Sequence, residues 1–357
     1  MSVEKRPDDE GTRRRRSATL ADIARAAGTS ASTASRALSG RGYVSPVARD
    51  RLLAAAEQLG YVPNASARTL KQQTSRIVGV AVSDLANQFY ACLAAGIEHT
   101  LRAAEYQMVV VSDNSDRRQE LACARTFIAM RTAGVIITPA DHAATSLLAR
   151  HGVSVVEVDR RLAKVDCDGV VIDNERGGRA ATAHLLGLGH RRVALLMADT
   201  DWTSDAGRRN GYRAAHEEAG LEVDERLIVP IAFHAADAEQ RIDALFEAER
   251  PTAVFAANNE LAQHAWQVLR RRRQRLPDDV SLVGFDDVPW MTMVAPRITV
   301  VAQPTLEMGR QAARLLLRRV EEPRRPTEVV RLEPALILRG STGPPARLTS
   351  PSRTRLD

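Results

Sequence analysis

The chain has 357 residues, of which 44% are hydrophobic and 26% are charged, so it is long enough for two or three globular domains. It has no run of about 18 or more uncharged apolar residues, and its polar N-terminus lacks the apolar core of a secretory signal. Both features predict a cytoplasmic protein without a membrane span. The three cysteines, Cys92, Cys123 and Cys167, never have CxxC spacing. We expect them to be buried and reduced, without disulfide or metal bonds.

Charge is distributed unevenly along the chain. Residues 1–76 contain 14 of the 50 basic residues and 7 of the 44 acidic ones, whereas the remainder is nearly balanced at 36 against 37. A basic excess confined to the start of a chain is the electrostatic pattern of a polyanion-binding module. A solvated basic tail at Arg13–Arg16 is the alternative explanation.

The first 60 residues contain the signals of three short helices. Thr19 and Asp22 form a capping-box pattern ahead of a helix that ends at Gly28. Ser30 is the expected cap of a second helix over 32–38, and a Ser-Pro pair typical of a helix start opens a third. Two helices joined by a short glycine-containing turn predict a helix-turn-helix.

Two motifs cover this region and the residues after it. The pattern T-L-x-D-I-A-x-x-A-G-x-S-x-S-T-x-S-R-x-L begins at Thr19, and G-Y-x-P-N-x-x-A-R-x-L runs from Gly60 to Leu70. Together they resemble the DNA-binding headpiece of the lactose-repressor family of bacterial regulators, with Ala34 where the family usually has valine. The resemblance implies that the second helix enters the major groove of double-stranded operator DNA.

The resemblance also implies two kinds of DNA contact. Ala31, Ser32 and Arg36 are the candidates for contacting base edges, because arginine binds guanine bidentately and alanine packs on a thymine methyl. Phosphate contacts that set the register are expected from Thr19, Ser30, Thr33, Ser35, Tyr61 and Asn64. For each hydroxyl, a plain helix cap or a solvated side chain is the alternative.

The segment Asn64–Lys71 is too short to form a stable helix alone. In the family that it resembles, this segment is a hinge helix that folds when two copies meet in the minor groove, which implies a homodimer. Leu70 would be the apolar wedge that kinks the duplex, and Ala67 and Arg68 would line the groove. The alternative for Leu70 is packing as an ordinary linker residue.

Beyond Arg76 the pattern changes to short β-branched apolar runs, most of them separated by helical segments. Eight runs are expected to be strands: RIVGVAV, YQMVVVSD, AGVIIT, VSVVEVD, DGVVID, RRVALLMA, TAVFAAN and VSLVGFD. Strands that alternate with helices predict parallel sheets. Their order resembles the family's periplasmic-binding-protein type I core, which implies two Rossmann-like α/β lobes with chain crossovers near Asn174, Gln303 and Arg331.

These patterns predict an all-α helix-turn-helix headpiece followed by an α/β core. We expect a disordered basic tail over 1–17, a DNA-binding domain over 18–62, and a hinge helix with its linker over 63–75. A two-lobed effector-binding and dimerisation domain follows over 76–342, and a second disordered tail over 343–357.

Polar and aromatic residues follow the expected strands, at the carboxyl ends where open parallel sheets bind ligands. DLANQFY at 84–90 resembles the family's D-x-x-N-P-F-F loop, and Arg208 matches the arginine of its R-x-x-G motif, which reaches into the cleft. The candidate ligand residues are Asn87, Phe89, Tyr90, Asp159, Trp202, Ser204, Arg208, Phe233, Asn258 and Asp286. Such a set suits a sugar, because charged and amide groups bind hydroxyls and rings cover C–H faces.

Structural alternatives exist for several of these side chains. Asp286 could cap the following turn, and Arg208 could form an interlobe salt bridge. Phe89 and Tyr90 could instead belong to the core or to a dimer interface. Gln88, which replaces the family's proline, leaves a nucleobase-type ligand or a protein partner open.

No catalytic or metal-binding motif accompanies these residues. The histidines lack HExxH spacing, and neither a G-x-S-x-G elbow nor a P-loop occurs, so we expect no enzyme and no cofactor. The sequence predicts a homodimeric transcriptional regulator, with a repressor as the preferred type. It would bind a palindromic operator and respond to a small-molecule effector, with a sugar as the first choice. A solute-binding protein is the weaker alternative.

Overall fold

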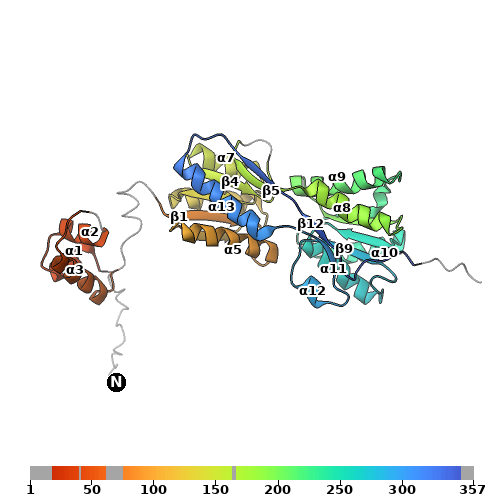
Figure 1. The fold of residues 1–357 in the computed structure, drawn as a ribbon, viewed down its shortest axis with the longest axis horizontal. Helices are drawn as coiled ribbons and strands as arrows, with labels where there is room; N and C mark the ends of the chain where they lie inside the picture. The colour runs from red at the N-terminus through yellow and green to blue at the C-terminus, as the bar shows by residue number, and fades with distance from the viewer. Residues whose placement is uncertain (1–17, 40–41, 62–74, 163–165, 347–357) are drawn as a thin grey trace, which may run out of the picture. The chain divides into compact units, whose positions relative to one another are not determined.

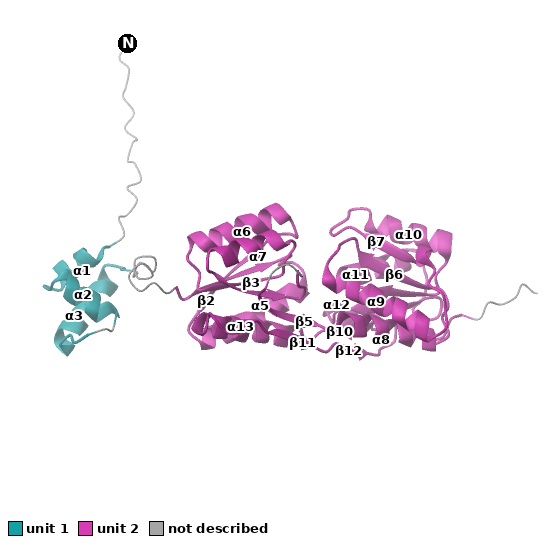
Figure 2. Cartoon of the chain, turned by 90° about the horizontal axis from the view of Figure 1, so that it is seen from above, with its two compact units in different colours: residues 1–74 teal, residues 75–357 magenta. Residues whose placement is uncertain are grey.

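The structure is a computed structural model that describes residues 18–39, 42–61, 75–162 and 166–346 (Figure 1). The chain separates into two compact units, residues 1–74 and residues 75–357 (Figure 2). Several expectations lie outside the described residues: the N-terminal tail, the C-terminal residues beyond 346, and the hinge contacts Asn64, Ala67, Arg68 and Leu70. None of the helices in the described ranges is both long and apolar enough to span a bilayer.

Within its described residues, the first unit contains three helices, α1 (Leu20–Ala26), α2 (Ala31–Ser39) and α3 (Pro46–Gln58). The expected capping box is present: Asp22 N donates to Thr19 Oγ1 at 3.3 Å, and Thr19 N donates to Asp22 Oδ2 at 2.9 Å. Gly28 follows α1 with a φ of +65°, a left-handed conformation that glycine adopts without strain.

A small apolar core holds these three helices together. Ile23 from α1, Ala34 from α2 and Leu52 from α3 are each fully buried. The alanine at position 34 is smaller than the valine that the family usually has there, yet it is a fully buried member of this cluster. The core therefore fixes the angle between α1 and α2 that a helix-turn-helix requires.

The second unit begins with a lobe built on a six-stranded parallel sheet in the order β11-β5-β4-β3-β1-β2. Its strands are β1 (Ile77–Val82), β2 (Gln107–Ser112), β3 (Gly134–Ile137), β4 (Ser154–Val158), β5 (Asp168–Ile172) and β11 (Val329–Leu332). Helices α6 (Arg117–Ala129) and α7 (His142–Arg150) lie on one face, and α5 (Gln88–Ala103) and α13 (Thr305–Glu321) on the other (Figure 2). We call this part lobe 1.

Lobe 2 is built on a second six-stranded sheet, in the order β12-β10-β9-β8-β6-β7. In this sheet only β12 is antiparallel to its neighbour. Its strands are β6 (Val193–Ala198), β7 (Ile228–Ile231), β8 (Ala253–Ala256), β9 (Ser281–Phe285), β10 (Thr299–Ala302) and β12 (Ala335–Ile337). Its helices are α8 (Asn174–Gly187), α9 (Thr203–Glu218), α10 (Ala238–Glu249), α11 (Asn259–Arg271) and α12 (Trp290–Met293), with a short 3₁₀ turn at Glu225–Leu227.

The chain passes between the lobes three times. It crosses from β5 to α8, from β10 to α13, and from β11 to β12 (Figure 1). These crossings agree with the expected positions near Asn174, Gln303 and Arg331. Each lobe is therefore assembled from segments that are distant in the sequence.

One pair of helices in each lobe approaches unusually closely through glycines. A Cβ atom on Gly309 of α13 would lie 2.2 Å from the carbonyl oxygen of Leu93 in α5. In lobe 2, a Cβ on Gly211 of α9 would lie 2.1 Å from the carbonyl oxygen of Glu175 in α8. Real Cβ atoms do not reach such distances, so only glycine allows these helix contacts.

All eight expected strands are present, and four more were not expected: β7, β10, β11 and β12. The cysteine expectation is only partly right. Cys167 is buried, but Cys92 and Cys123 are half-buried and all three are free. Folded contacts also extend to Gly343, whose N–H donates to Ser281 Oγ at 3.0 Å, one residue into the expected tail.

Candidate ligand cleft and DNA-binding surface

A cavity lies between the two lobes and encloses about 460 Å³, counting the part that opens to solvent. All ten residues that the sequence singled out as ligand candidates line it: Asn87, Phe89, Tyr90, Asp159, Trp202, Ser204, Arg208, Phe233, Asn258 and Asp286. Six further residues complete the lining: Arg160, Ala198, Asp205, Asn259, Glu260 and Gln303.

Two aspartates occupy matching positions in the two lobes. Asp159 follows β4 and Asp286 follows β9, each the third strand of its sheet. Both have left-handed backbones, with φ values of +74° and +72°, and both side chains are buried. Aspartate tolerates this conformation better than most residues. The turn directs each carboxylate into the cleft instead of continuing the strand.

Asp286 is held by two amides. Asn259 donates to its Oδ2 at 2.8 Å, and Gln303 donates to its Oδ1 at 2.6 Å. Asn259 also donates to Asn87 Oδ1 at 3.2 Å, across the two lobes. In the described chain, no backbone N–H donates to the carboxylate of Asp286, so this side chain does not cap the following turn. Its neighbour Asp287 instead pairs with Arg339 at 2.7 Å.

Arg208 is a buried arginine that retains hydrogen-bonding capacity. Its Nε donates to Asn174 Oδ1 at 2.9 Å, and its Nη1 donates to the carbonyl oxygen of Ala257 at 2.5 Å. The guanidinium carbon lies 3.7 Å from the centre of the Phe285 ring. Within the described ranges it forms no ion pair, so the alternative of an interlobe salt bridge is not realised there. Its Nη2 also has no protein partner in those ranges.

The neighbouring cleft residues Asn258 and Asn259 have different roles from those that the sequence indicated. The expected ligand residue Asn258 caps α11, since its Oδ1 accepts from Leu261 N at 2.8 Å. Asn259, which the sequence analysis did not select, bridges Asp286 and Asn87. Asn87 also caps α5 by accepting from Phe89 N at 3.0 Å.

The aromatic side chains meet edge to face. Phe89 and Tyr90 have ring centres 5.0 Å apart at 82°, and Trp202 and Phe233 have centres 6.1 Å apart at 66°. Phe89 and Tyr90 also belong to the buried core of lobe 1. Both the core role and the cleft position expected of them are therefore present.

The exposed side of α2 carries the expected base-contacting residues. Ala31, Ser32 and Arg36 are exposed, whereas Thr33 and Ser35 are half-buried. Tyr61 is also half-buried, and the Thr19 hydroxyl, as described, takes part in the capping box.

Ser30 is the cap of α2. Its Oγ accepts from Thr33 N at 3.1 Å and lies 2.8 Å from Ser32 Oγ. The cap role that the sequence left open is thus realised for Ser30 and for Thr19. A capping hydroxyl at an exposed helix start can still accept a further contact.

Comparisons with known proteins identify this architecture. Residues 19–64 match the family model described as "Bacterial regulatory proteins, lacI family", and residues 182–342 match a "Periplasmic binding protein-like domain". The "HTH-type transcriptional regulator DegA" of Bacillus subtilis is 33% identical over 91% of this chain and 98% of its own. This chain belongs to the LacI family.

Two solved structures agree with this assignment. A complex of the transcriptional regulator CelR with cellobiose is 32% identical, covers 91% of this chain and 99% of its own, and superposes with a TM-score of 0.70. The lac repressor dimer bound to operator and an anti-inducer is 25% identical and has a TM-score of 0.79. The match covers 92% of this chain and 100% of the lac repressor chain. The chain is thus a LacI-family transcriptional regulator with a DNA-binding domain and an effector-binding domain.

The cleft of this LacI-family regulator is rich in charge. Four carboxylates and two guanidinium groups line it: Asp159, Asp205, Glu260, Asp286, Arg160 and Arg208. Burial raises the pKa of Asp159 and of Asp205, and the nearby guanidinium groups oppose that rise. In the described ranges, no cluster of three or more His, Cys, Asp or Glu side chains is arranged to bind a metal.

Proposed function

We propose that this LacI-family regulator is a repressor that binds a palindromic operator as a homodimer and that an uncharged sugar in the interlobe cleft controls its DNA affinity. The observation that carries the proposal is the cavity lining, in which carboxylates, amides and an arginine with unpaired donors lie among aromatic rings. Sugar hydroxyls donate to carboxylates and accept from guanidinium groups, and sugar C–H faces pack on rings.

The charge of the lining supports an uncharged ligand. Four carboxylates and two guanidinium groups line the cleft, and burial favours the neutral forms of Asp159 and Asp205. The lining therefore has no excess of positive charge to hold a phosphorylated sugar or another anion. Asp286 and Asp159 would accept hydroxyl hydrogens from opposite lobes, and Arg208 would donate through its Nη2. Asn87, Asn258 and Ser204 would supply neutral polar contacts. Phe89, Tyr90, Trp202 and Phe233 would supply the apolar walls.

On the DNA side, we assign base contacts to Ala31, Ser32 and Arg36 and phosphate contacts to the hydroxyl set around them. The exposure of the first three supports this assignment. The family pattern supports minor-groove roles for Ala67, Arg68 and Leu70. We also retain the proposed boundaries of the DNA-binding domain at 18–62, the hinge at 63–75 and the effector-binding domain at 76–342.

A ligand that contacts both lobes changes their relative angle, and the hinge segments transmit this change to the DNA-binding domains. The coupling is reciprocal: the factor by which the sugar changes DNA affinity equals the factor by which DNA changes sugar affinity. A sugar that lowers DNA affinity is an inducer, and one that raises it is a corepressor.

The test is fluorescence anisotropy of the purified protein on DNA from its own promoter region, at a stated salt concentration. Titrations would be repeated with a panel of neutral sugars, phosphorylated sugars and nucleobases. A shift with a neutral sugar alone supports the proposal. A shift only with a phosphorylated sugar or a nucleobase would overturn the assignment of the ligand class, and absence of DNA binding would overturn the repressor.

A further inference from the structure

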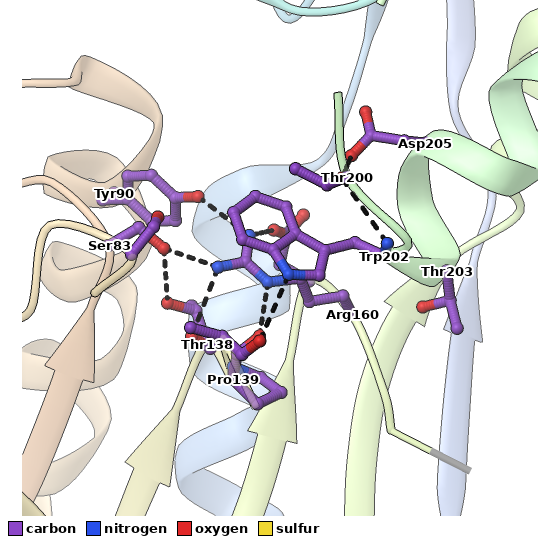
Figure 3. Close-up of polar contacts among 12 residues, drawn as sticks. Ser83, Tyr90, Thr138, Pro139, Arg160, Thr200, Trp202, Thr203 and Asp205 are labelled. Atoms are coloured by element: carbon purple, nitrogen blue, oxygen red, sulfur yellow. Dashed lines mark hydrogen bonds and ion pairs between the residues drawn. The ribbon is translucent and has the colours of Figure 1, made fainter. Parts of the chain in front are cut away.

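Tyr43 has the most exposed of the large hydrophobic side chains in the described ranges, with an exposed fraction of 86%. Aromatic side chains of the cleft are engaged by the protein: the Trp202 ring lies 3.5 Å from the guanidinium carbon of Arg160, and Tyr90 Oη accepts from Arg160 Nη1 at 3.3 Å (Figure 3). The hydroxyl of Tyr43 has no hydrogen-bond partner within the described ranges. Its ring and its donor are therefore available to a molecule outside the chain.

The residues on either side of Tyr43 fix where its side chain lies. Val44 is 8% exposed and belongs to the small core of the first unit, so the two neighbouring side chains point in opposite directions. On the other side, a Cβ atom on Gly42 would lie 3.2 Å from Cδ of Arg36. The connection between α2 and α3 thus runs against the exposed arginine of α2 to which we assign a base contact.

The charge around this connection favours a polyanion. Residues 23–49 contain four arginines and no acidic residue. The first turn of α3 likewise has no carboxylate, so the positive end of its helix dipole, just after Tyr43, is not compensated there. Ser45 caps α3 by accepting from Ala48 N at 3.4 Å and is itself exposed. A DNA phosphate beside Tyr43 would therefore meet a positive potential.

We propose that Tyr43 is a further DNA contact of this regulator and that its hydroxyl donates to a phosphate oxygen of the strand beside α2. Tyrosine hydroxyls are among the usual donors to DNA phosphates, and such contacts set the register without reading the sequence. Tyr43 lies between the two family motifs, which end at Leu38 and resume at Gly60. The inference rests on the DNA-binding role of α2 and extends it to the connection that follows.

The test is fluorescence anisotropy of the full chain, without sugar, on two labelled duplexes: DNA from its own promoter region and a scrambled duplex of the same composition. Tyr43→Phe removes only the hydroxyl and should weaken binding to both duplexes about tenfold, as expected for a hydrogen bond to a charged group. Tyr43→Ala should weaken binding at least as much. Because the side chain is exposed, both variants should unfold at the temperature of the parent.

Leu53→Ala is the matched control, because it truncates another exposed side chain of the first unit that has no hydrogen-bond donor. It should bind both duplexes as the parent does. Equal affinities of Tyr43→Phe and the parent would overturn the proposal. A loss confined to the promoter duplex would also overturn it, since the hydroxyl would then contact a base. An equal loss in Leu53→Ala would overturn it as well, because any truncation of this surface would then have the same effect.

The dependence of binding on salt separates a direct contact from a displaced domain. A neutral hydroxyl releases no counterion, so the slope of log affinity against log salt concentration should be the same in Tyr43→Phe and the parent. A shallower slope in the variant would overturn the proposal, because arginine–phosphate contacts would then be lost too. Failure of the repressor is a separate result: a parent that binds no DNA contradicts the proposed function, whereas equal binding by parent and variant contradicts the role of Tyr43 alone.

Discussion

At the scale of single residues, backbone conformation decides which side chains reach the cleft. Asp159 and Asp286 enter it because each strand ends in a left-handed residue. Neighbours in the sequence can therefore have opposite roles, as Asn258 caps a helix while Asn259 holds Asp286. A side chain's position in the cleft follows from its place after a strand, but its hydrogen-bond partners do not.

This distinction explains what could be predicted from the sequence at this scale. Strand-end positions and the family's motifs together selected residues that all line one cavity. The sequence analysis missed three polar residues of the cleft. Arg160 and Asn259 each adjoin a residue that was selected, and Gln303 follows β10, a strand that was not expected. A rule that takes the polar neighbours of each selected residue would have found Arg160 and Asn259. It would have missed Gln303, because β10 was not expected.

The role of Asp286 can be tested by Asp286→Asn, which preserves the left-handed backbone because asparagine also tolerates it. Loss of the charge should weaken sugar affinity about tenfold or more, as expected for a charged hydrogen bond, and leave DNA binding without sugar unchanged. Isothermal titration with the sugar identified by anisotropy measures the effect. Asp287→Asn is the control and should bind sugar normally; an unaltered affinity in Asp286→Asn would contradict the assignment.

At the scale of elements, the two lobes share one packing device. In each, a pair of helices is brought together by glycines whose hydrogens touch the opposing backbone. The eight expected strands are mostly buried runs of β-branched residues, which makes them visible in the sequence. The four unexpected strands are short; β7 contains Pro230, and β11 and β12 are half-exposed. Their pairing depends on the sheet beside them more than on their own residues.

Replacing one of these glycines should separate its helices. In Gly211→Ala the new methyl would meet the carbonyl oxygen of Glu175, and the free energy of unfolding should fall by about 3 kcal/mol. Gly187→Ala in α8 is the control, since nothing lies within 4 Å of its added Cβ, and alanine there should leave stability equal or slightly higher. Urea unfolding monitored by circular dichroism measures both. Similar stabilities of the two variants would show that the helices can move apart at no cost.

At the scale of the whole molecule, stability depends on buried groups whose charge changes with pH. Glu120 of α6 is buried, and burial raises its pKa to about 8, although Ala140 N and Asp141 N both donate to its oxygens. The folded chain therefore keeps a proton that the unfolded chain releases at its ordinary pKa of 4.5. This contribution to stability is full at acid pH and is lost as pH rises toward about 8.

Glu120→Gln cannot ionise and should remove this dependence. The free energy of unfolding of the variant minus that of the parent should be larger at about pH 8 than at about pH 5. At about pH 8 the parent carries a buried negative charge at Glu120, and the variant does not. Urea unfolding at the two pH values gives the difference. If the stability of the variant relative to the parent is the same at both, Glu120 ionises in the folded protein as it does in water.

Coupling between the DNA-binding and effector-binding parts is tested by Leu70→Ala. If Leu70 wedges into the minor groove, the variant should lose specific operator affinity by about tenfold or more while it binds sugar normally. Anisotropy on operator and on scrambled DNA, beside titration with the sugar, separates the two properties. Wild-type affinity for the operator would remove the wedge from the mechanism.

The three crossings between the lobes carry a mechanical consequence. The three short crossings lie side by side and join the two lobes as a hinge. Sliding or twisting one lobe against the other would stretch at least one crossing, whereas bending about the line of the crossings stretches none. Opening of the cleft then has essentially one degree of freedom. If the cleft binds an effector as proposed, every ligand would act along this single coordinate, and inducers and antagonists would differ in how far and in which direction they move the protein along it.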